Sequence, residues 1–430
     1  MSRLFATLEA KPVQYVKICS LYGAGFYYIP GTDTCIKIGG YVRAEWNYQA
    51  GGSFKPFLVY NFDDPGRDRY TERTRGGITV DVRSQTAYGT LRSYAVVMPT
   101  HTNDGGNGGS PYGTLFSPAV FIQFAGFTFG KTASFFDFDT NPYTNATIHA
   151  GSNQAGNGIQ VFAYTAQFGN GFSASISAED TTSRRSAIVG PTTAYGGRRW
   201  PDLVANLRID QAWGSAQIMG GIHDVYANTG LGTDEADTGW AIGAGLRINL
   251  PMIGAGDYLI AQVAYMEGAA NYIWNQAGAG GLMVNLADGF PVTAAGTDAA
   301  IGYIADAVNV GGSLDLTTGW SVTAGFEHKW NPAWKTSLYG TYSEFSYSSG
   351  ASAVIAGLLG GGALVGSADW SMWQIGSRTV WTPVANLDLS VDVLYTKVNT
   401  GFAGSNATVG TVDDNDIFAA IFRAQRNFWP

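Results

Sequence analysis

The sequence predicts an all-β fold, a transmembrane antiparallel β-barrel of about sixteen strands, and three observations predict it. First, segments of roughly ten residues alternate apolar and polar side chains along most of the chain. Second, long and short connections follow these segments in turn. Third, only 13% of the residues are charged, while 58 Gly, 23 Tyr, 23 Phe and 12 Trp are present. That charged share is about half the usual value for a soluble domain, and it suits a lipid-facing surface bordered by aromatic rings.

The first predicted strand, 36–48, shows the alternation clearly. Ile36 and Trp46 fall on one face, and Arg43 and Glu45 fall on the other. Successive strand side chains point to opposite faces, so this strand has one apolar and one charged side. In a soluble sandwich these sides would face a core and bulk water. In a barrel they face lipid and a wet lumen, which is the interpretation that the composition favours.

The same alternation places the other strands in chain order. Short joins follow the even-numbered strands and long loops follow the odd-numbered ones. Both chain termini are therefore expected on the side of the short turns, which is periplasmic in outer-membrane barrels. The predicted strands are 36–48, 70–84, a third that ends near Met98, 119–125, 127–135, 158–168, 172–180, 201–212, 215–225, 238–249, 257–267, 318–330, 335–347, 368–382, 386–397 and 415–428.

The 430 residues are expected to form one barrel, because no Pro-rich or Ser-rich linker divides the chain into soluble domains. We expect an N-terminal lead over 1–35 and the transmembrane barrel over 36–428. Met1 to Lys11 lacks the basic and apolar regions of a secretory signal, so no signal peptide is visible. The formal net charge of -8, without a basic stripe, predicts no nucleic-acid partner.

One segment, Gly350 to Ala368, is uncharged, largely apolar and about the length of a membrane-spanning helix. It contains six Gly, and each Gly in a helix interior costs on the order of 1 kcal/mol relative to Ala. The sequence therefore predicts an apolar outer loop here, with a spanning helix as the alternative.

The two cysteines, Cys19 and Cys35, both lie in the lead. Neither has a Cys or His neighbour at metal-ligand spacing, so no metal site is expected. In an oxidising compartment they predict a disulfide, and two unpaired buried thiols are the alternative.

Three stretches carry a resemblance to a known family. They are YVKICSLYGAGFYYIPGTDTCIKIGGYVRAEW from Tyr15 to Trp46, FIQFAGFTFGKTASFFDF from Phe121 to Phe138, and RAQRNF from Arg423 to Phe428. These resemble the start, the segment before the constriction loop and the closing strand of alphaproteobacterial porins. The resemblance implies a sixteen-stranded, homotrimeric general-diffusion porin of the bacterial outer membrane. Such a protein passes small hydrophilic solutes and ions passively, and no cofactor is expected.

The resemblance also implies that the third loop folds inward to narrow the lumen, and by connection count this loop is 136–157. The earliest strands should supply the facing wall. The predicted constriction residues are Arg43, Glu45, Arg73, Arg75, Arg83, Arg92, Asp137 and Asp139. Acids on the loop opposite arginines on the wall would set a transverse field that filters solutes by charge. The alternative is that the arginines only solvate the lumen or pair locally with Glu45 or Asp81.

Three other classes of function are alternatives to a passive pore. A substrate-specific sugar channel should line its path with aromatic rings, and the inward candidates are only Tyr94, Phe162 and Tyr164. An adhesin or structural anchor tolerates a plugged lumen, whereas inward positions such as Ser173 and Ser175 stay small and polar. An enzyme is not expected, because the four histidines are dispersed and none lies in an H-E-x-x-H motif.

Acidic side chains in the outer loops would bridge divalent cations to lipopolysaccharide, or they are simply solvated. They include Asp63, Asp64, Asp234, Glu235 and Asp237. The lumen arginines and the acidic net charge push the ion preference in opposite directions, so the sequence leaves that preference open.

Overall fold

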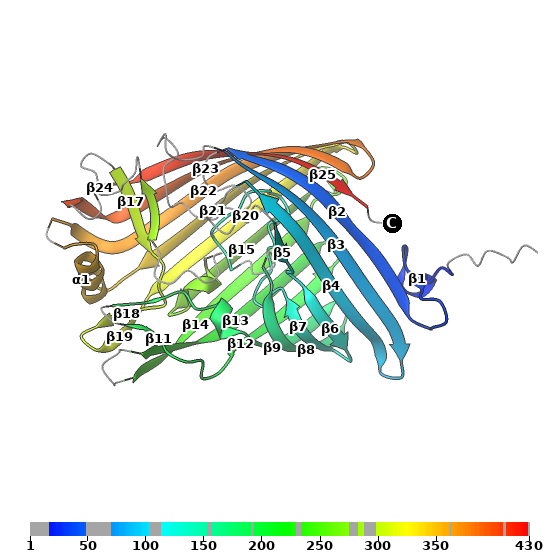
Figure 1. Ribbon diagram of the computed structural model, residues 1–430, viewed down its shortest axis with the longest axis horizontal. Helices are drawn as coiled ribbons and strands as arrows, with labels where there is room; N and C mark the ends of the chain where they lie inside the picture. Colours follow the sequence, from blue (N-terminus) through cyan, green and yellow to red (C-terminus); the bar gives the residue numbers. More distant parts are fainter. Residues whose placement is uncertain are drawn as a thin grey trace, which may run out of the picture.

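The chain folds into a closed antiparallel β-barrel of sixteen strands, which Figure 1 shows from the side. The fold class predicted from the sequence is therefore confirmed. The structure is a computed structural model, and it describes residues 17–48, 70–103, 113–152, 157–190, 193–228, 234–274, 283–287, 298–361, 363–406 and 410–428.

Each barrel strand pairs with its neighbours in chain order, and β25 closes the barrel onto β2 with Tyr41 opposite Asn427. The barrel strands are β2 (Cys35–Tyr48), β3 (Tyr70–Thr86), β4 (Gly89–Thr102), β6 (Val120–Phe124), β7 (Phe127–Thr132), β8 (Ile159–Gly169), β9 (Phe172–Glu179), β12 (Asp202–Gln211), β13 (Gly214–Asn228), β14 (Asp234–Asn249), β15 (Tyr258–Glu267), β20 (Thr318–Asn331), β21 (Trp334–Ser346), β22 (Val365–Val384), β23 (Leu387–Asn406) and β25 (Asn415–Asn427).

The predicted strands match these in number and order, but several boundaries differ, and β22, β23 and β7 show the physical reasons. Strands β22 and β23 each extend to 20 residues, because their outer ends continue past the apolar band and pair with each other and with the outer-loop strand β24 (Gly410–Val412). Strand β7 ends at Thr132 rather than at 135, because the chain then turns into the lumen. Alternation reports where a strand crosses the apolar band and not where its hydrogen bonds end.

Short turns and the C-terminal end of the barrel gather at the right of Figure 1, and the long loops gather at the left. The outer loops carry their own small elements. These are β5 (Thr114–Phe116), η2 (Thr181–Ser183), β10 (Ile188–Val189), β11 (Ala194–Tyr195), η3 (Ala270–Tyr272), β16 (Met283–Ala287), β17 (Asp298–Tyr303), β18 (Ala307–Val310), β19 (Ser313–Leu316) and α1 (Ser349–Leu358), together with β24.

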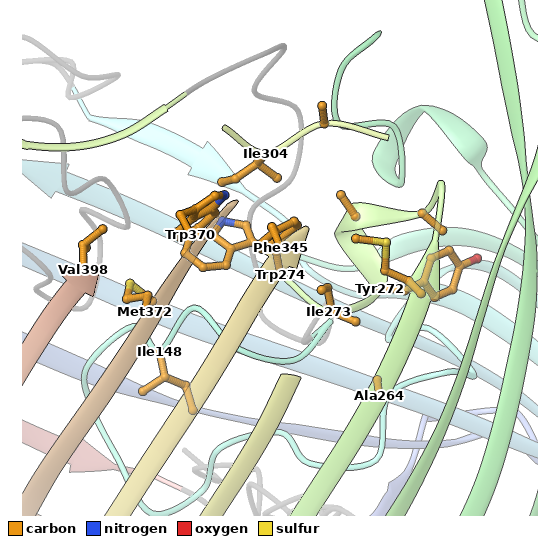
Figure 2. Close-up of a cluster of buried hydrophobic side chains, with 14 of the residues drawn as sticks. Ile148, Ala264, Tyr272, Ile273, Trp274, Ile304, Phe345, Trp370, Met372 and Val398 are labelled. Carbon is orange, nitrogen blue, oxygen red and sulfur yellow. The ribbon is translucent and has the colours of Figure 1, made fainter. Parts of the chain in front are cut away.

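An aromatic core joins these loops to the inner wall (Figure 2). Trp274 of the sixth outer loop, 268–317, packs on Trp370 with ring centroids 5.2 Å apart, and Phe345 stacks on Trp370 at 4.8 Å. Ile148 of the third outer loop belongs to the same buried cluster. The outer half of the lumen is thus partly filled by loop side chains that bury apolar surface against the barrel.

The apolar segment at Gly350 lies in the seventh outer loop, as the predicted outer loop requires, and part of it is helical. Helix α1 starts at an N-cap, Ser348, whose hydroxyl accepts a hydrogen bond from the backbone N–H of Ala351. It packs Ile355 into the aromatic core. Within the described residues, no helix combines the length and the apolarity needed to cross a membrane.

The predicted disulfide is confirmed. Cys19 and Cys35 are bonded, with their Cα atoms 6.1 Å apart, and both are buried together with Phe26. The lead also includes η1 (Ser20–Tyr22) and β1 (Tyr27–Tyr28), which pairs with the start of β2 at the short-turn end of the barrel. The described part of the lead is therefore a small cross-linked unit at the periplasmic mouth.

Candidate pore constriction

The third outer loop, which joins β7 to β8, folds into the lumen. Gln262 of β15 accepts hydrogen bonds from the backbone N–H groups of Phe138 and Asp139, both at 2.9 Å. Further along, Gln374 of β22 accepts from the backbone N–H of His149 at 2.9 Å. Inward glutamine side chains thus replace the hydrogen bonds that a loop inside a barrel would otherwise lose.

Two inward glycines make room for the loop. A side chain at Gly245 would collide with the ring of Phe138, and one at Gly325 would collide with the ring of Tyr143. Small inward residues were expected to leave the pore open, and at these two positions they receive loop aromatics instead. The loop therefore lies against the wall from β14 to β20.

Asp392 of β23 holds the far end of the loop. Its carboxylate accepts from the hydroxyl of Thr144 at 2.8 Å and from the backbone N–H of Asn145 at 2.6 Å, and Tyr339 donates to it at 2.6 Å. Asn145 in turn accepts from Arg423 of β25 at 2.6 Å. The far end of the loop thus reaches β25, whose Arg423 is the register partner of Glu45 on β2.

The two loop acids occupy different positions. Asp139 is only 4% exposed and accepts hydrogen bonds from the hydroxyl of Tyr143 at 2.7 Å and of Thr323 at 3.2 Å. Burial raises the pKa of Asp139, against the lowering effect of those hydrogen bonds. Asp139 therefore faces the wall behind the loop. Asp137 is half-buried and accepts a hydrogen bond from the hydroxyl of Ser152.

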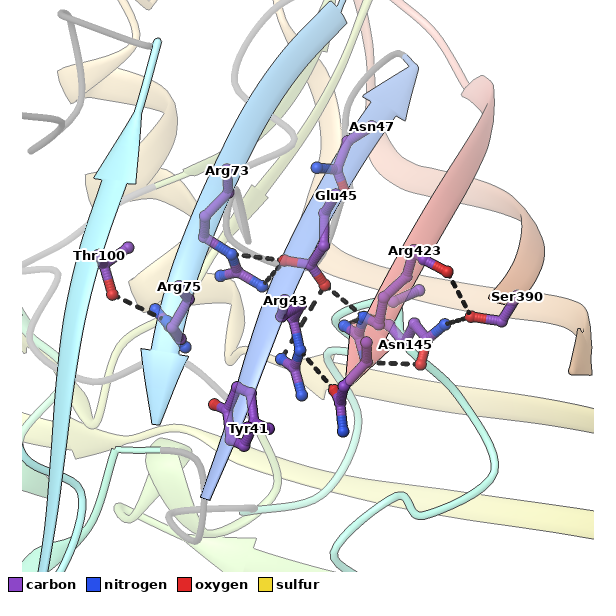
Figure 3. A network of polar contacts seen from close by, with 12 residues as sticks. Tyr41, Arg43, Glu45, Asn47, Arg73, Arg75, Thr100, Asn145, Ser390 and Arg423 are labelled. Atoms are coloured by element: carbon purple, nitrogen blue, oxygen red, sulfur yellow. Dashed lines mark hydrogen bonds and ion pairs between the residues drawn. The ribbon is translucent and has the colours of Figure 1, made fainter. Parts of the chain in front are cut away.

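Four arginines gather around one carboxylate on the inner wall formed by β2, β3 and β25 (Figure 3). Glu45 accepts from Arg73 and Arg423, and it lies 3.9 Å from Arg43. Arg75 is the register partner of Arg43. We call these five residues the upper basic cluster.

A second group, the lower basic cluster, lies toward the periplasm on the same wall. Arg83 and Arg92 both contact Asp81, at 2.8 Å and 2.9 Å, and Lys37 is the register partner of Asp81. Arg92 also lies over the ring of Tyr94, 4.8 Å from its centroid. The local pairing with Glu45 and Asp81 that the sequence left open is thus present in both clusters.

Of the three aromatic candidates for a sugar path, only Tyr94 faces the lumen. It stacks on Phe121 with ring centroids 5.2 Å apart. Phe162 and Tyr164 are 62% and 42% exposed and lie on the outer face of β8, beside Phe129 and Phe127. The expectation that Phe162 and Tyr164 point inward is wrong, because the register of β8 places Val161 and Ala163 on the lumen side.

Several residues that build the site were not singled out from the sequence. Arg423 belongs to the last strand, and only closure of the barrel brings it beside Arg43 and Glu45. Gln262 and Gln374 are neutral inward residues with no distinguishing pattern. Strand phase identifies all three as lumen residues, but their roles depend on the path of the loop.

His149 is a buried imidazole between the third and sixth outer loops. It stacks on Trp274 with ring centroids 4.9 Å apart, and neither of its ring nitrogens has a hydrogen-bond partner among the described residues. Burial lowers the pKa of His149 to about 4. Over the described residues, no group of three His, Cys, Asp or Glu side chains is placed to hold a metal ion.

A closed barrel whose lumen is narrowed by an inward loop defines a porin-type channel. The family model described as a porin subfamily matches residues 6–421, and the chain belongs to that family. The chain is 31% identical over 216 residues to porin Omp2b of Brucella abortus, a match that covers 48% of this chain and 56% of that relative. A match to porin Omp2b of Brucella melitensis has 30% identity over the same length. The match thus spans little more than half the length of these curated relatives.

Solved structures show the same fold. The outer membrane channel DcaP of Acinetobacter baumannii superposes with a TM-score of 0.68 at 15% identity, covering 93% of this chain and 99% of that one. OmpF of Salmonella typhi, in complex with daunomycin, superposes with a TM-score of 0.52 at 12% identity and the same coverage. At these identities the likeness concerns the barrel architecture.

Proposed function

We propose that the chain forms a water-filled channel in the outer membrane for passive diffusion of small hydrophilic solutes and ions. The observation that carries this proposal is the wet wall opposite the third loop. The side chains of Arg43, Arg83 and Arg92 keep 17%, 27% and 26% of their surface exposed inside the barrel. Charged groups retain such exposure where water fills the space beside them.

The filter comprises seven of the eight residues predicted for it, and the eighth, Asp139, has a structural role. Arg43, Arg73, Arg75 and Glu45 form its upper part, and Arg83 and Arg92 form its lower part. Asp137 is the loop carboxylate that remains half-buried, and it lines a pocket of the lumen with Gln123 and Arg208. Asp139 instead fastens the loop to β20 through Thr323.

Passive diffusion is favoured over a saturable sugar site. Sugar channels stack sugar faces on a continuous series of aromatic rings. Here Tyr94 and Phe121 form one stacked pair, and Phe162 and Tyr164 face outward.

Three short strands support assembly as a homotrimer. They are β6, β7 and β9, with 5, 6 and 8 residues, and we call this part of the barrel the low wall. A membrane-crossing strand needs about nine to eleven residues, so this part of the wall does not span the apolar band alone. Strand alternation also places Glu72, His101 and Lys131 on the outer surface of the neighbouring β3, β4 and β7. Charged and polar residues on that surface suit contact with other copies better than contact with lipid.

Single-channel recording of the purified protein in planar bilayers tests the proposal. We expect ohmic openings in three equal steps, with no saturable block by oligosaccharides. Saturable block would replace passive diffusion with a specific sugar channel, and absence of any conductance would overturn the channel itself. Single steps would overturn the trimer alone.

A further inference from the structure

The upper basic cluster carries a net positive charge. Among the described residues it brings four guanidinium groups to one carboxylate, an excess of three positive charges over these five side chains. Glu45 is occupied by Arg73 and Arg423. The other two arginines bond to neutral acceptors, since Arg43 donates to the side chain of Gln425 at 2.8 Å and Arg75 to the hydroxyl of Thr100 at 2.9 Å.

The third loop supplies little opposing charge. Its sequence over 133–157 contains two acids, Asp137 and Asp139, one histidine, His149, and no Lys or Arg. Asp139 is turned toward β20 and is buried there by Tyr143 and Thr323. Among the described residues 133–152, the exposed ones are the neutral Thr140 and Pro142. Of the two loop acids expected to oppose the arginines, only Asp137 stays half-buried, and it lies beside Gln123 and Arg208 rather than against the upper basic cluster.

The positive charge continues toward the periplasm. Arg83 and Arg92 share the carboxylate of Asp81, which leaves one positive charge over these three described residues. Lys37 and Arg43 lie six positions apart on β2, which corresponds to roughly 20 Å along the strand. An anion that passes the upper cluster thus meets a second basic group on the same wall.

From this arrangement we infer that the pore selects for anions, and that Arg43 and Arg75 are the residues that determine the selectivity. The inference rests on the proposed channel function and names the solutes that the channel favours. It also resolves the conflict with the acidic net charge. The outer acids Asp234 and Asp237 are exposed at the wide mouth, where salt screens them within about 10 Å at 0.1 M. The arginines act at the narrow point, where an ion passes close to them with little water between.

The test is the reversal potential across a KCl gradient in planar bilayers. We expect a chloride-to-potassium permeability ratio of roughly 3 to 10 near 0.1 M salt, falling toward 1 at 1 M because the screening length shrinks to about 3 Å. Arg75→Gln should lower the ratio at least about twofold, and the double variant Arg43→Gln with Arg75→Gln should bring it to about 1 or below.

Lys335→Gln is the control. It removes the same charge from an inward position on β21, where Lys335 pairs with Glu327 at 3.2 Å, away from both basic clusters and from Asp137. The ratio should stay within experimental error of the unsubstituted protein. Heat-modifiable migration on gels confirms that each variant is a folded barrel.

The outcomes separate the two proposals. Absence of conductance in the unsubstituted protein overturns the proposed channel. Open channels that prefer potassium, or a chloride preference that Lys335→Gln removes and the double variant keeps, overturn the anion filter and leave the channel intact.

Discussion

At the scale of single residues, the constriction depends on wall side chains that hold the third loop. Asp392 shows this most directly, because its carboxylate accepts hydrogen bonds from Thr144, Asn145 and Tyr339. The alternation of β23 predicts that Asp392 points inward, and from the sequence alone its charge could simply be solvated by water in the lumen. The loop contacts give it a structural role instead.

Asp392→Asn should loosen the third loop. The substitution replaces one acceptor oxygen with an N–H₂ group that faces donors, and a buried donor left unpaired costs about 1–3 kcal/mol. We expect more frequent closing events in single-channel records and a lower closing voltage. Asp388→Asn on the same strand is the control, because Asp388 accepts from Thr382 rather than from the loop. Equal effects of the two substitutions would contradict the anchoring role.

His149 should make the loop sensitive to acid. Burial lowers its pKa from 6.5 to about 4, so between these values only the detached imidazole binds a proton. The free energy that holds the third loop on the sixth is thus complete above pH 6.5 and falls as the pH drops to about 4. The total loss is about 3 kcal/mol.

Closing frequency recorded from pH 7 to pH 4 measures this effect, and we expect it to rise within that window. His149→Phe keeps the ring stacked on Trp274 without a titrating group, so its profile should be flatter. A profile that His149→Phe leaves unchanged would assign the acid response to other groups.

At the scale of elements, a buried histidine of the wall takes part in holding the fourth and sixth outer loops. His223 of β13 lies 2.8 Å from Asp202 and 3.7 Å from Asp306 of the sixth loop. Asp306 also accepts from the backbone N–H of Ser186 in the fourth loop, and from that of Ala270, both at 2.7 Å. Two loops and the wall therefore share one buried ionic contact.

His223→Leu should release the outer loops, because two buried carboxylates then lose their shared partner. Breaking a buried charge pair in this way costs about 3–5 kcal/mol. Hydrogen exchange should become faster over 184–190 and 300–317 and should stay unchanged in β20 to β23. His328→Leu is the control, since His328 pairs with Asp257 at the periplasmic end. Unaltered exchange in both loops would show that other contacts hold them.

At the scale of the whole molecule, strand alternation predicted the barrel because lipid and lumen impose opposite polarity on successive residues. The sixteen strands and the order of turns and loops follow from that rule. The loop contacts do not, since Gln262 and Gln374 differ from other inward polar residues only through the path of residues 133–152. The sequence likewise placed Asp137 and Asp139 together, whereas the fold buries Asp139 and separates their roles.

Assembly is the last property that belongs to the whole molecule, and one outward position on each side of the barrel tests it. Val97 of β4 lies beside the low wall and pairs with Ile78 on the outer face. Val263 of β15 is 47% exposed among apolar neighbours and should face lipid. Val97→Arg should convert the proposed homotrimer to monomers in detergent, because each contact would have to bury an unpaired guanidinium group.

Size-exclusion chromatography with light scattering reads this outcome directly. Val263→Arg should remain trimeric in detergent, although an arginine near the middle of the bilayer costs roughly 2–4 kcal/mol in the membrane. The opposite result, monomers from Val263→Arg and trimers from Val97→Arg, would move the interface to β15. Because the constriction lies inside each barrel, monomers of Val97→Arg should still conduct, in single steps of one third the trimer's total and with the same ion preference.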